Sequence, residues 1–504
     1  MPLTMSNEIK IASQDANTSA TEAPLSPGRR KFLKRAAGLG ALTVAAPALQ
    51  LSGKSTQLST GGLSGVKNCI FLVVDGMGRG TLSASNEYAL DQTGRELHWL
   101  KLLKENTVTT ALQNTASQSS KVTDSAAASS AWASGRRVPN GRINVTAEGE
   151  RLEPIFSRAK ARGKAIGLVT TTRITHATPA GFVASVVDRN DESSIAQQYL
   201  EQEIDLLMGG GARYFNREGA QLRKAFEASG YTSVDSLDSL LANEKRSKLL
   251  GLFSESHLPY AIDRKHAKQH FQIPSLPAMF RVALNNLSQN AAGFCLQVES
   301  GRVDHAGHAK DVAAIVEEQL EFDQCIPIAM DFVDQNPDTL LIITTDHGTG
   351  GCQLNGFGDG YAGSNETMRK IAKIRASFES LAEATQQLNR ADRNLFRSQL
   401  GIELRAEDEA VIQSMLNGEY RIHSSGYHDA SEGSDSGFQH DYLAANLSSY
   451  FEKYFSKQTG IGWTSNAHTA ELVDLIAYGA ESETIPRYIQ NYELNALIKN
   501  ALKL

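Results

Sequence analysis

The chain has 504 residues, of which 41% are hydrophobic and 21% are charged, and its formal net charge at pH 7 is −6. This composition excludes a disordered, collagen-like or coiled-coil protein. The 50 Lys and Arg residues face 56 Asp and Glu residues, so the chain lacks a general positive field, and we expect no nucleic-acid partner. The 4 cysteines form no CxxC pair and indicate neither a zinc knuckle nor a dense disulfide framework. The length implies two domains or one large sheet with insertions.

The first 48 residues resemble a twin-arginine export signal. A basic stretch with paired arginines, GRRKFLKR at 28–35, precedes a mildly apolar run and a small-residue cleavage sequence at 46–48. Gly28 departs from the usual Ser or Thr, and a solvated basic patch before a core helix would explain the charges but not the cleavage sequence. The run is too short to span a membrane. We expect residues 1–48 to be cleaved, 49–66 to be a linker, and the chain to be exported by the twin-arginine machinery, without a stable membrane anchor, to a periplasmic or secreted location.

Short β-branched runs that end abruptly in polar or glycine-rich residues indicate buried parallel strands. These runs lie at 69–74, 165–170, 204–208, 294–298 and 340–344. Helical patterns lie between them at 152–161, 192–201 and 313–332. The alternation predicts an α/β fold with a doubly wound, mostly parallel central sheet and helices on both faces. Ligands of such sheets bind beyond the carboxyl ends of the strands.

The sequence changes character between about 362 and 460, where amphipathic stretches and Ser/Gly-rich segments replace the alternating pattern. We interpret this region as an inserted cap, so that 67–361 and 461–504 form the catalytic domain. His and Asp residues between His423 and Asp441 could hold a further cation, but a mobile, solvated loop is the favoured interpretation.

Two motifs suggest an anion site. Asp124 is a good helix N-cap, and Ser125 then lies in the first turn, where exposed N–H groups and the helix dipole favour an anion such as a phosphoryl group. A plain N-cap would have the same sequence. Arg189 follows the run that ends near His176 and could bind two phosphate oxygens as a fork, although a surface Arg is usually only solvated.

Carboxylates and imidazoles gather at the ends of the other predicted strands. The segment 298–308 contains Glu299, Asp304, His305 and His308, and a helix starting there would place Asp304 and His308 on one face. Such mixed oxygen and nitrogen donors suit zinc, while Glu299 suits magnesium. A purely structural cluster would need partners for four polar groups, which is costly. Similar groups occur at Asp75, Asp346 with His347, Thr178 and His468, each of which is unremarkable alone.

Taken in chain order, these segments resemble the alkaline phosphatase family from Asn68 to about Asp346 and around His468. The resemblance implies a hydrolase of phosphate monoesters, often a homodimer, in which Ser125 is the nucleophile, Arg189 binds phosphate and Asp124 fixes both. It also implies two zinc ions and one magnesium. Their ligands would be Asp304, His308 and His468 for one zinc, Asp75, Asp346 and His347 for the other, and Asp75, Thr178 and Glu299 for magnesium.

Two site positions vary within that family. A nitrogen donor at His176 could let zinc or cobalt compete with magnesium for the third site. His305 would bind phosphate less strongly than a permanent cation at alkaline pH. Both are therefore expected to contact substrate or to lie just behind the ligands.

The residues themselves support the same chemistry. A serine hydroxyl is a weak nucleophile, and the sequence has no GxSxG elbow to activate it, whereas two zinc ions could stabilise its alkoxide and the leaving oxygen, giving a phosphoserine intermediate. Alternatives on the same scaffold are a phosphodiesterase, a phosphonate hydrolase or a specialised phosphatase. A sulfatase is disfavoured because its modification motif is absent around Ser125. A non-catalytic alternative is a periplasmic protein that binds phosphate or metal.

Overall fold

A ten-stranded sheet lies at the centre of the fold. In the computed structural model, which describes residues 65–105, 107–216, 221–419 and 442–504, residues 62–504 belong to one compact unit. The spatial order is β14 (Tyr488–Gln490), β2 (Thr109–Asn114), β13 (Val473–Gly479), β8 (Thr339–Thr344), β1 (Asn68–Val74), β7 (Phe294–Ser300), β3 (Ala165–Arg173), β4 (Leu206–Gly210), β6 (Leu249–Leu252) and β5 (Thr232–Val234). All neighbours run parallel except β13, which is antiparallel to β2 and β8.

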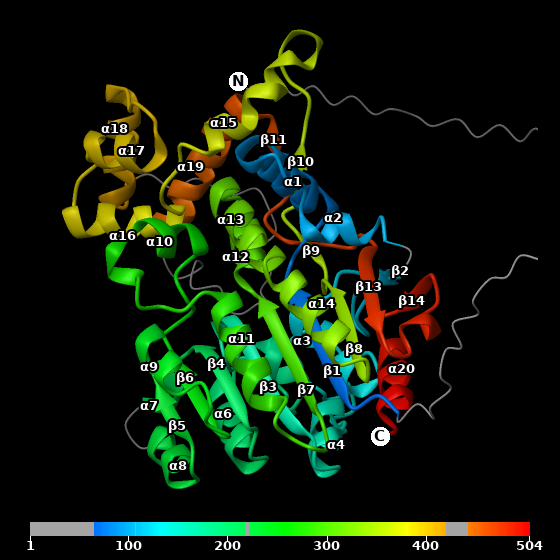
Figure 1. Ribbon diagram of the computed structural model, residues 1–504. Coiled ribbons are helices and arrows are strands. Elements are labelled where there is room, and N and C mark those ends of the chain that lie inside the picture. The colour runs from blue at the N-terminus through cyan, green and yellow to red at the C-terminus, as the bar shows by residue number, and fades with distance from the viewer. Residues whose placement is uncertain (1–64, 106, 217–220, 420–441) are drawn as a thin grey trace, which may run out of the picture. The chain divides into compact units, whose positions relative to one another are not determined.

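Helices cover both faces of this sheet (Figure 1). Strand β1 shows why, because its side chains alternate between two hydrophobic clusters: Ile70 and Leu72 enter one, and Phe71 and Val73 enter the other. The first cluster is covered by α1 (Arg79–Thr93), α2 (His98–Leu102), α11 (Leu276–Leu287), α13 (Val312–Asp323) and α14 (Cys325–Gln335). The second is covered by α3 (Ser125–Ser134), α4 (Ile155–Ala161), α6 (Glu192–Glu201), α8 (Leu222–Ala228) and α20 (Glu493–Leu502). The predicted doubly wound α/β fold is therefore confirmed.

Some predicted boundaries were wrong. Strand β3, predicted over 165–170, extends to Arg173. Strand β4, predicted over 204–208, begins at Leu206. The helix predicted over 313–332 is two helices, which meet at Gln324. Pro327 explains the break, because proline has no N–H to donate and its ring would clash with the carbonyl four residues earlier in a continuous helix.

The described part of 362–460 is helical. It contains α15 (Thr367–Ile371), α16 (Phe378–Leu388), α17 (Arg393–Leu400), α18 (Ala406–Leu416) and α19 (Tyr442–Thr459), after the 3-10 turn η2 (Asp359–Glu366). Their buried side chains, such as Phe378 and Phe451, belong to the same hydrophobic cluster as the α1 and α13 face of the sheet. The chain therefore packs this region onto the sheet domain through continuous apolar contacts.

The start of α16 is also held by hydrogen bonds to the sheet domain. Asp263 of α10 (Ala261–His266) accepts from the backbone N–H of Ser377 at 2.9 Å and from its hydroxyl at 2.7 Å. Asp311 accepts from the N–H of Phe378 at 2.6 Å. Two buried carboxylates thus satisfy N–H groups that a helix start leaves without intrahelical partners. Figure 1 shows α16 beside α10.

The remaining elements are short. They are α5 (Ala177–Gly181), α7 (Arg213–Asn216), α9 (Leu237–Ala242), η1 (Lys268–His270), α12 (Arg302–Ala309), η3 (Ser482–Thr484) and the paired strands β9 (Gly348–Thr349) with β12 (His468–Thr469) and β10 (Gln353–Leu354) with β11 (Ile461–Gly462).

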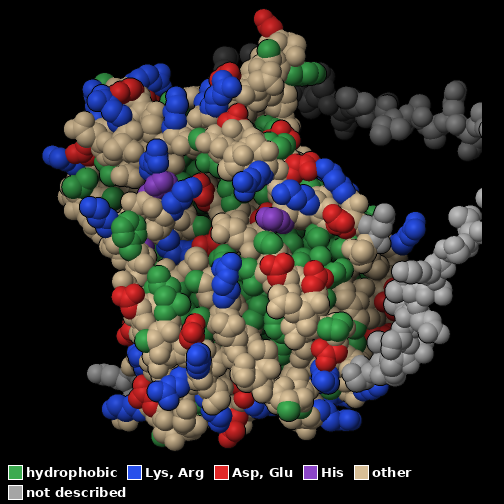
Figure 2. Space-filling model, viewed as in Figure 1, with side chains coloured by type: hydrophobic (Ala, Val, Ile, Leu, Met, Phe, Trp, Pro, Cys, Tyr) green, Lys and Arg blue, Asp and Glu red, His purple; other side chains and the backbone are tan. Residues whose placement is uncertain are grey.

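None of the helices in the described ranges is both long and apolar enough to cross a membrane. Positive and negative side chains are interspersed on the face drawn in Figure 2. The predicted export signal, most of the predicted linker and the segment between His423 and Asp441 lie outside the described residues.

Candidate active site

The predicted site residues gather where four neighbouring strands end. Strands β8, β1, β7 and β3 are adjacent and parallel, so their carboxyl ends lie at one edge of the sheet. Asp346 follows β8, Asp75 follows β1, Glu299 is the penultimate residue of β7 and His176 follows β3. The register confirms the alignment, because Glu299 lies opposite Val73 and Thr170 of the flanking strands.

The first cluster contains Asp75, Asp346 and His347, whose donor atoms lie within 4.8 Å of one another. His347 Nε2 is 3.1 Å from Asp346 Oδ2 and 3.7 Å from Asp75 Oδ1. The Gly76 N–H donates to Asp346 Oδ1 at 3.0 Å and fixes the carboxylate. Burial, reinforced by the carboxylates of Asp346, Asp304 and Glu299, raises the pKa of Asp75 well above its usual range. The cluster therefore holds more negative charge than its protein partners neutralise.

The second cluster contains Asp304, His308 and His468. Helix α12 places Asp304 and His308 one turn apart, with His308 Nε2 3.3 Å from Asp304 Oδ2, as the sequence spacing predicts. His468 arrives from β12, and its Nε2 is 3.1 Å from Nε2 of His308. Burial would raise the pKa of Asp304, but His308 and His468 lower it well below its usual range.

The backbone decides which nitrogen of each imidazole in the second cluster can bind a cation. His308 Nδ1 lies 2.6 Å from the carbonyl oxygen of Asn466, and His468 Nδ1 lies 2.8 Å from that of Thr123. A carbonyl oxygen only accepts hydrogen bonds, so each Nδ1 carries a proton, and in the neutral ring each Nε2 presents its lone pair. Two such lone pairs facing each other beside the Asp304 carboxylate form a donor set suited to a cation.

The two clusters are in contact. The rings of His347 and His468 stack with centroids 3.6 Å apart, and the Thr349 hydroxyl donates to Asp304. Gly76 makes the approach possible: its φ is +75°, and a Cβ there would lie 2.6 Å from the Cα of Asp304. Only glycine fits such a position without displacing α12, the helix that carries Asp304 and His308.

Ser125 lies beside the first cluster. It is the first residue of α3, is almost fully buried, and its Oγ is 3.4 Å from His347 Nε2. Asp124 caps the helix through Oδ1, which accepts from the Ala127 N–H at 2.9 Å, and its Oδ2 accepts from Arg189 Nη1 at 3.0 Å. A guanidinium and a helix N-terminus thus converge near one hydroxyl, which favours binding of an anion.

A third group of oxygen atoms lies behind Asp75. Thr178 Oγ1 donates to Asp75 Oδ2 at 3.2 Å, and Thr170 Oγ1 donates to Glu299 Oε2 at 2.5 Å. Burial raises the pKa of Glu299 to about 7. Donor atoms of Asp75, His176 and Glu299 lie within 4.8 Å of one another.

The ring of His176 lies in a cluster of three imidazoles with His257 and His305, and His257 is not predicted from the sequence. His257 follows β6, and its ring centroid is 4.4 Å from that of His305 and 5.9 Å from that of His176. His176 Nε2 is 3.2 Å from Arg189 Nη2. Burial, assisted by nearby arginines, lowers the pKa of all three imidazoles well below the usual range. No local motif in the sequence marks His257, because its partners come from β3 and α12.

The donor atoms fit metal ions. Asp75 Oδ1, Glu299 Oε1 and Asp346 Oδ2 are buried and accept no hydrogen bond from any residue that the structure describes. Buried carboxylates in this state are costly unless a cation lies between them. The sets around Asp304 and Asp346 suit zinc. The oxygens near Glu299 suit magnesium, with His176 shifting that preference toward a softer metal.

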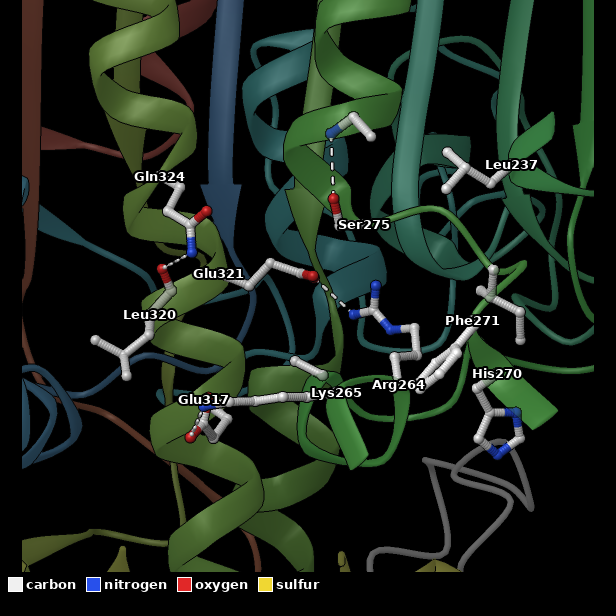
Figure 3. A pocket seen from close by; sticks show the side chains of 13 residues that line it. Leu237, Arg264, Lys265, His270, Phe271, Ser275, Glu317, Leu320, Glu321 and Gln324 are labelled. Carbon is white, nitrogen blue, oxygen red and sulfur yellow. Dashed lines mark hydrogen bonds and ion pairs between the residues drawn. The ribbon is translucent and has the colours of Figure 1, made fainter. Parts of the chain in front are cut away.

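A separate pocket of about 450 Å³ lies between α10, α11 and α13, and none of the predicted site residues lines it. Figure 3 shows its charged side chains paired with one another: Arg264 with Glu321 and Lys265 with Glu317. Their charges are neutralised within the wall, so the pocket lacks the convergent donors of the strand-end site.

The fold and the donor groups define a metal-dependent hydrolase of the doubly wound α/β class. Comparison with known proteins narrows this class: residues 66–504 match the family model described as alkaline phosphatase. The chain belongs to the alkaline phosphatase family, whose members hydrolyse phosphate monoesters, and the predicted enzyme class is confirmed.

Individual relatives agree with this assignment. The chain is 31% identical to alkaline phosphatase 3 of Bacillus subtilis over 94% of this chain and 98% of that protein. It is 30% identical to the alkaline phosphatase of Escherichia coli, over 62% of this chain and 77% of that protein. Among solved structures, the Thermus thermophilus alkaline phosphatase is similar with a TM-score of 0.77 and 34% identity, covering 87% of this chain and 92% of that one.

Proposed function

We propose that the chain hydrolyses phosphate monoesters through a phosphoserine intermediate on Ser125. The supporting observation is the position of its hydroxyl at the start of α3, 3.4 Å from His347 Nε2 and beside the Arg189 held by Asp124. In the first step Ser125 Oγ bonds to phosphorus, the bond from phosphorus to the ester oxygen breaks, and the alcohol leaves. In the second step water displaces Ser125 from phosphorus, releasing phosphate and restoring the hydroxyl.

The protein side chains have distinct parts in this proposal. Arg189 donates to two charged oxygens of the phosphoryl group, and Asp124 keeps the guanidinium in place. The exposed N–H groups at the start of α3 add to the positive potential there. A diester has one charged oxygen fewer than a monoester, so this arrangement favours the monoester over the phosphodiesterase alternative.

Three metal sites complete the proposal. Asp304, His308 and His468 would hold one zinc, Asp75, Asp346 and His347 a second, and Asp75, Thr178 and Glu299 a magnesium, with zinc or cobalt as competitors near His176. When bound, these cations would stabilise negative charge on the attacking and leaving oxygens.

Replacement of Ser125 tests the mechanism. Ser125→Ala should lower kcat on an aryl phosphate by roughly 10³-fold or more, because no other hydroxyl takes its place. Ser134→Ala, at the other end of α3, is the matched control and should keep the activity. Acid quenching with radiolabelled substrate should trap phosphoserine in the Ser134 variant and not in the Ser125 variant. Full turnover by Ser125→Ala would refute the assignment.

We also propose export by the twin-arginine route. The support is the sequence alone: paired Arg29 and Arg30, a mildly apolar run and a small-residue cleavage sequence ending at Ala48. Changing both arginines to lysine keeps the charge and should retain the protein in the cytoplasm at full length. Unchanged export of that variant, measured by fractionation, would remove the proposal.

A further inference from the structure

A buried arginine connects His305 to helix α16. Arg302 is 2% exposed, its Nη1 lies 2.8 Å from His305 Nδ1, and its Nη2 donates to Glu379 at 2.8 Å. The guanidinium also lies over the ring of Tyr260, with its carbon 3.7 Å from the ring centroid. Glu379 supplies the negative charge opposite Arg302, so the position of the guanidinium depends on a residue from the region 362–460.

The guanidinium fixes the protonation pattern of His305. Arginine has only donors, so His305 Nδ1 must accept and its proton must reside on Nε2. The ring plane is set by His257, which meets His305 edge to face with an interplanar angle of 74°. His305 therefore offers a neutral N–H donor in a fixed direction.

That donor is linked through His176 to Arg189, the arginine proposed to bind phosphate. The ring centroid of His305 is 5.8 Å from that of His176, which in turn contacts Arg189. His305 also follows Asp304 directly on α12, so a change in its ring orientation takes place beside a proposed metal ligand.

Glu379 can act in this way because its own position is fixed. It lies in the first turn of α16, directly after Ser377 and Phe378, whose N–H groups are bound by Asp263 and Asp311. These hydrogen bonds hold the start of α16 in place, and with it the Glu379 side chain that accepts from Arg302.

We propose that Glu379 is a positioning residue for phosphate binding: through Arg302 it holds His305 as an Nε2–H donor oriented toward the phosphoryl group. The proposal rests on the proposed function, in which that group binds beside Ser125 and Arg189. It gives helix α16 an indirect part in the affinity of the site for phosphate.

The test compares two ion pairs of the same region. Glu379 is 34% exposed and pairs with Arg302, whereas Glu409 is 33% exposed and pairs with Arg393, away from the proposed site. In zinc-loaded protein, calorimetry should show inorganic phosphate binding about tenfold more weakly to Glu379→Ala than to Glu409→Ala. KM for an aryl phosphate should rise in parallel, with a smaller change in kcat. Glu379→Gln keeps an acceptor for Arg302 and should restore most of the affinity, even if the alanine variant folds poorly.

A double-mutant cycle tests the route through His305. If Glu379 acts through this imidazole, Glu379→Ala should cost no further phosphate affinity in a His305→Ala background. Equal phosphate affinity of Glu379→Ala and Glu409→Ala, or a full additional loss in the His305→Ala background, would overturn the inference. Because the binding measurement needs no turnover, it is independent of the Ser125 test, so either proposal can fail alone.

Discussion

The partner of the second ring nitrogen determines what each imidazole near the site can do. Backbone carbonyls accept from Nδ1 of His308 and His468, which leaves the Nε2 lone pairs for a cation. A guanidinium donates to Nδ1 of His305, which leaves an N–H for an anion. One hydrogen bond at Nδ1 thus determines whether Nε2 of each histidine can bind a cation or donate to an anion.

Replacement of Asp124 by Asn separates helix capping from the holding of Arg189. The Asn side chain keeps one oxygen for the Ala127 N–H, but its amide N–H₂ repels the guanidinium that Asp124 Oδ2 now accepts from at 3.0 Å. We expect kcat/KM for a monoester to fall by about 10–100-fold, with a smaller fall for a diester. Steady-state kinetics on both substrates measure the difference.

Arg189→Ala is the control for this prediction. If Asp124 acts only by holding Arg189, the double variant should be scarcely worse than Arg189→Ala alone. Equal losses on monoester and diester would contradict the role of Asp124 in holding a phosphate-binding arginine.

At the residue scale, the sequence predicts the groups that lie in local motifs. The spacing of Asp304 and His308 anticipates their shared helix face. The proposed carboxylate and imidazole ligands lie in the three groups, and Thr178 bonds to Asp75. The sequence does not reveal Thr349 or Glu379, whose hydrogen-bond partners are 45 and 77 residues away along the chain. Such contacts depend on how separate elements pack, so no local pattern marks them.

Among the elements, the turn after β1 carries the tightest steric constraint at the site. An alanine at Gly76 would need φ near +75° and would place Cβ 2.6 Å from the Cα of Asp304. We expect Gly76→Ala to lower the free energy of unfolding by roughly 2–4 kcal/mol and to reduce bound zinc, because α12 must shift. Chemical denaturation and metal analysis measure both effects.

Gly94→Ala is a matched control for that change. Gly94 ends α1 with φ of +67°, and no atom would lie within 4 Å of the added Cβ. It should therefore show backbone strain of about 1–2 kcal/mol with full zinc content. Equal zinc loss in both variants would show that the contact with Asp304 is unimportant.

The docking of α16 should depend on pH through Asp263. Burial raises the pKa of this carboxyl to about 7, although hydrogen bonds from Ser377 oppose the shift. The folded protein therefore holds the proton more tightly than the unfolded chain, so the stabilising contribution is full below about pH 4 and is lost as the pH rises through about 7. Between pH 8 and pH 5, wild type should gain about 2–3 kcal/mol of stability relative to Asp263→Asn. Urea titrations at the two pH values test this, and a constant difference would contradict it.

The strands differ in how well the sequence indicates them. Strands β1, β3, β7 and β8 are buried on both faces and each contains an apolar run, from which the sequence predicts it. Strand β2 was missed, because its sequence TTALQN is polar and only partly buried. Strand β5 has only 3 residues, which is too short for any periodicity.

On the scale of the whole molecule, the site joins segments from nearly the full described length. Thr123 and His468 meet across 345 residues of sequence, and the proposed ligands come from β7, α5, α12, β12 and the turns after β1 and β8. An unfolded chain cannot hold these donors together, so a bound cation stabilises the folded state alone. Metal affinity and fold stability are therefore coupled.

Removal of metal should accordingly lower the melting temperature. The buried carboxylates of Asp75, Glu299, Asp304 and Asp346 would then face one another without cations. Two sites at a hundredfold excess over Kd contribute about 5 kcal/mol, so treatment with a chelator should lower Tm by on the order of 5–10 °C in scanning calorimetry. Added zinc should restore Tm, and magnesium alone should restore it less, because imidazole nitrogen occurs in both proposed zinc sites. Asp304→Asn should show a smaller chelator effect than wild type, since one site is already weakened. An unchanged Tm after verified metal removal would mean that these carboxylates are neutralised without cations, and the proposed metal sites would have to be abandoned.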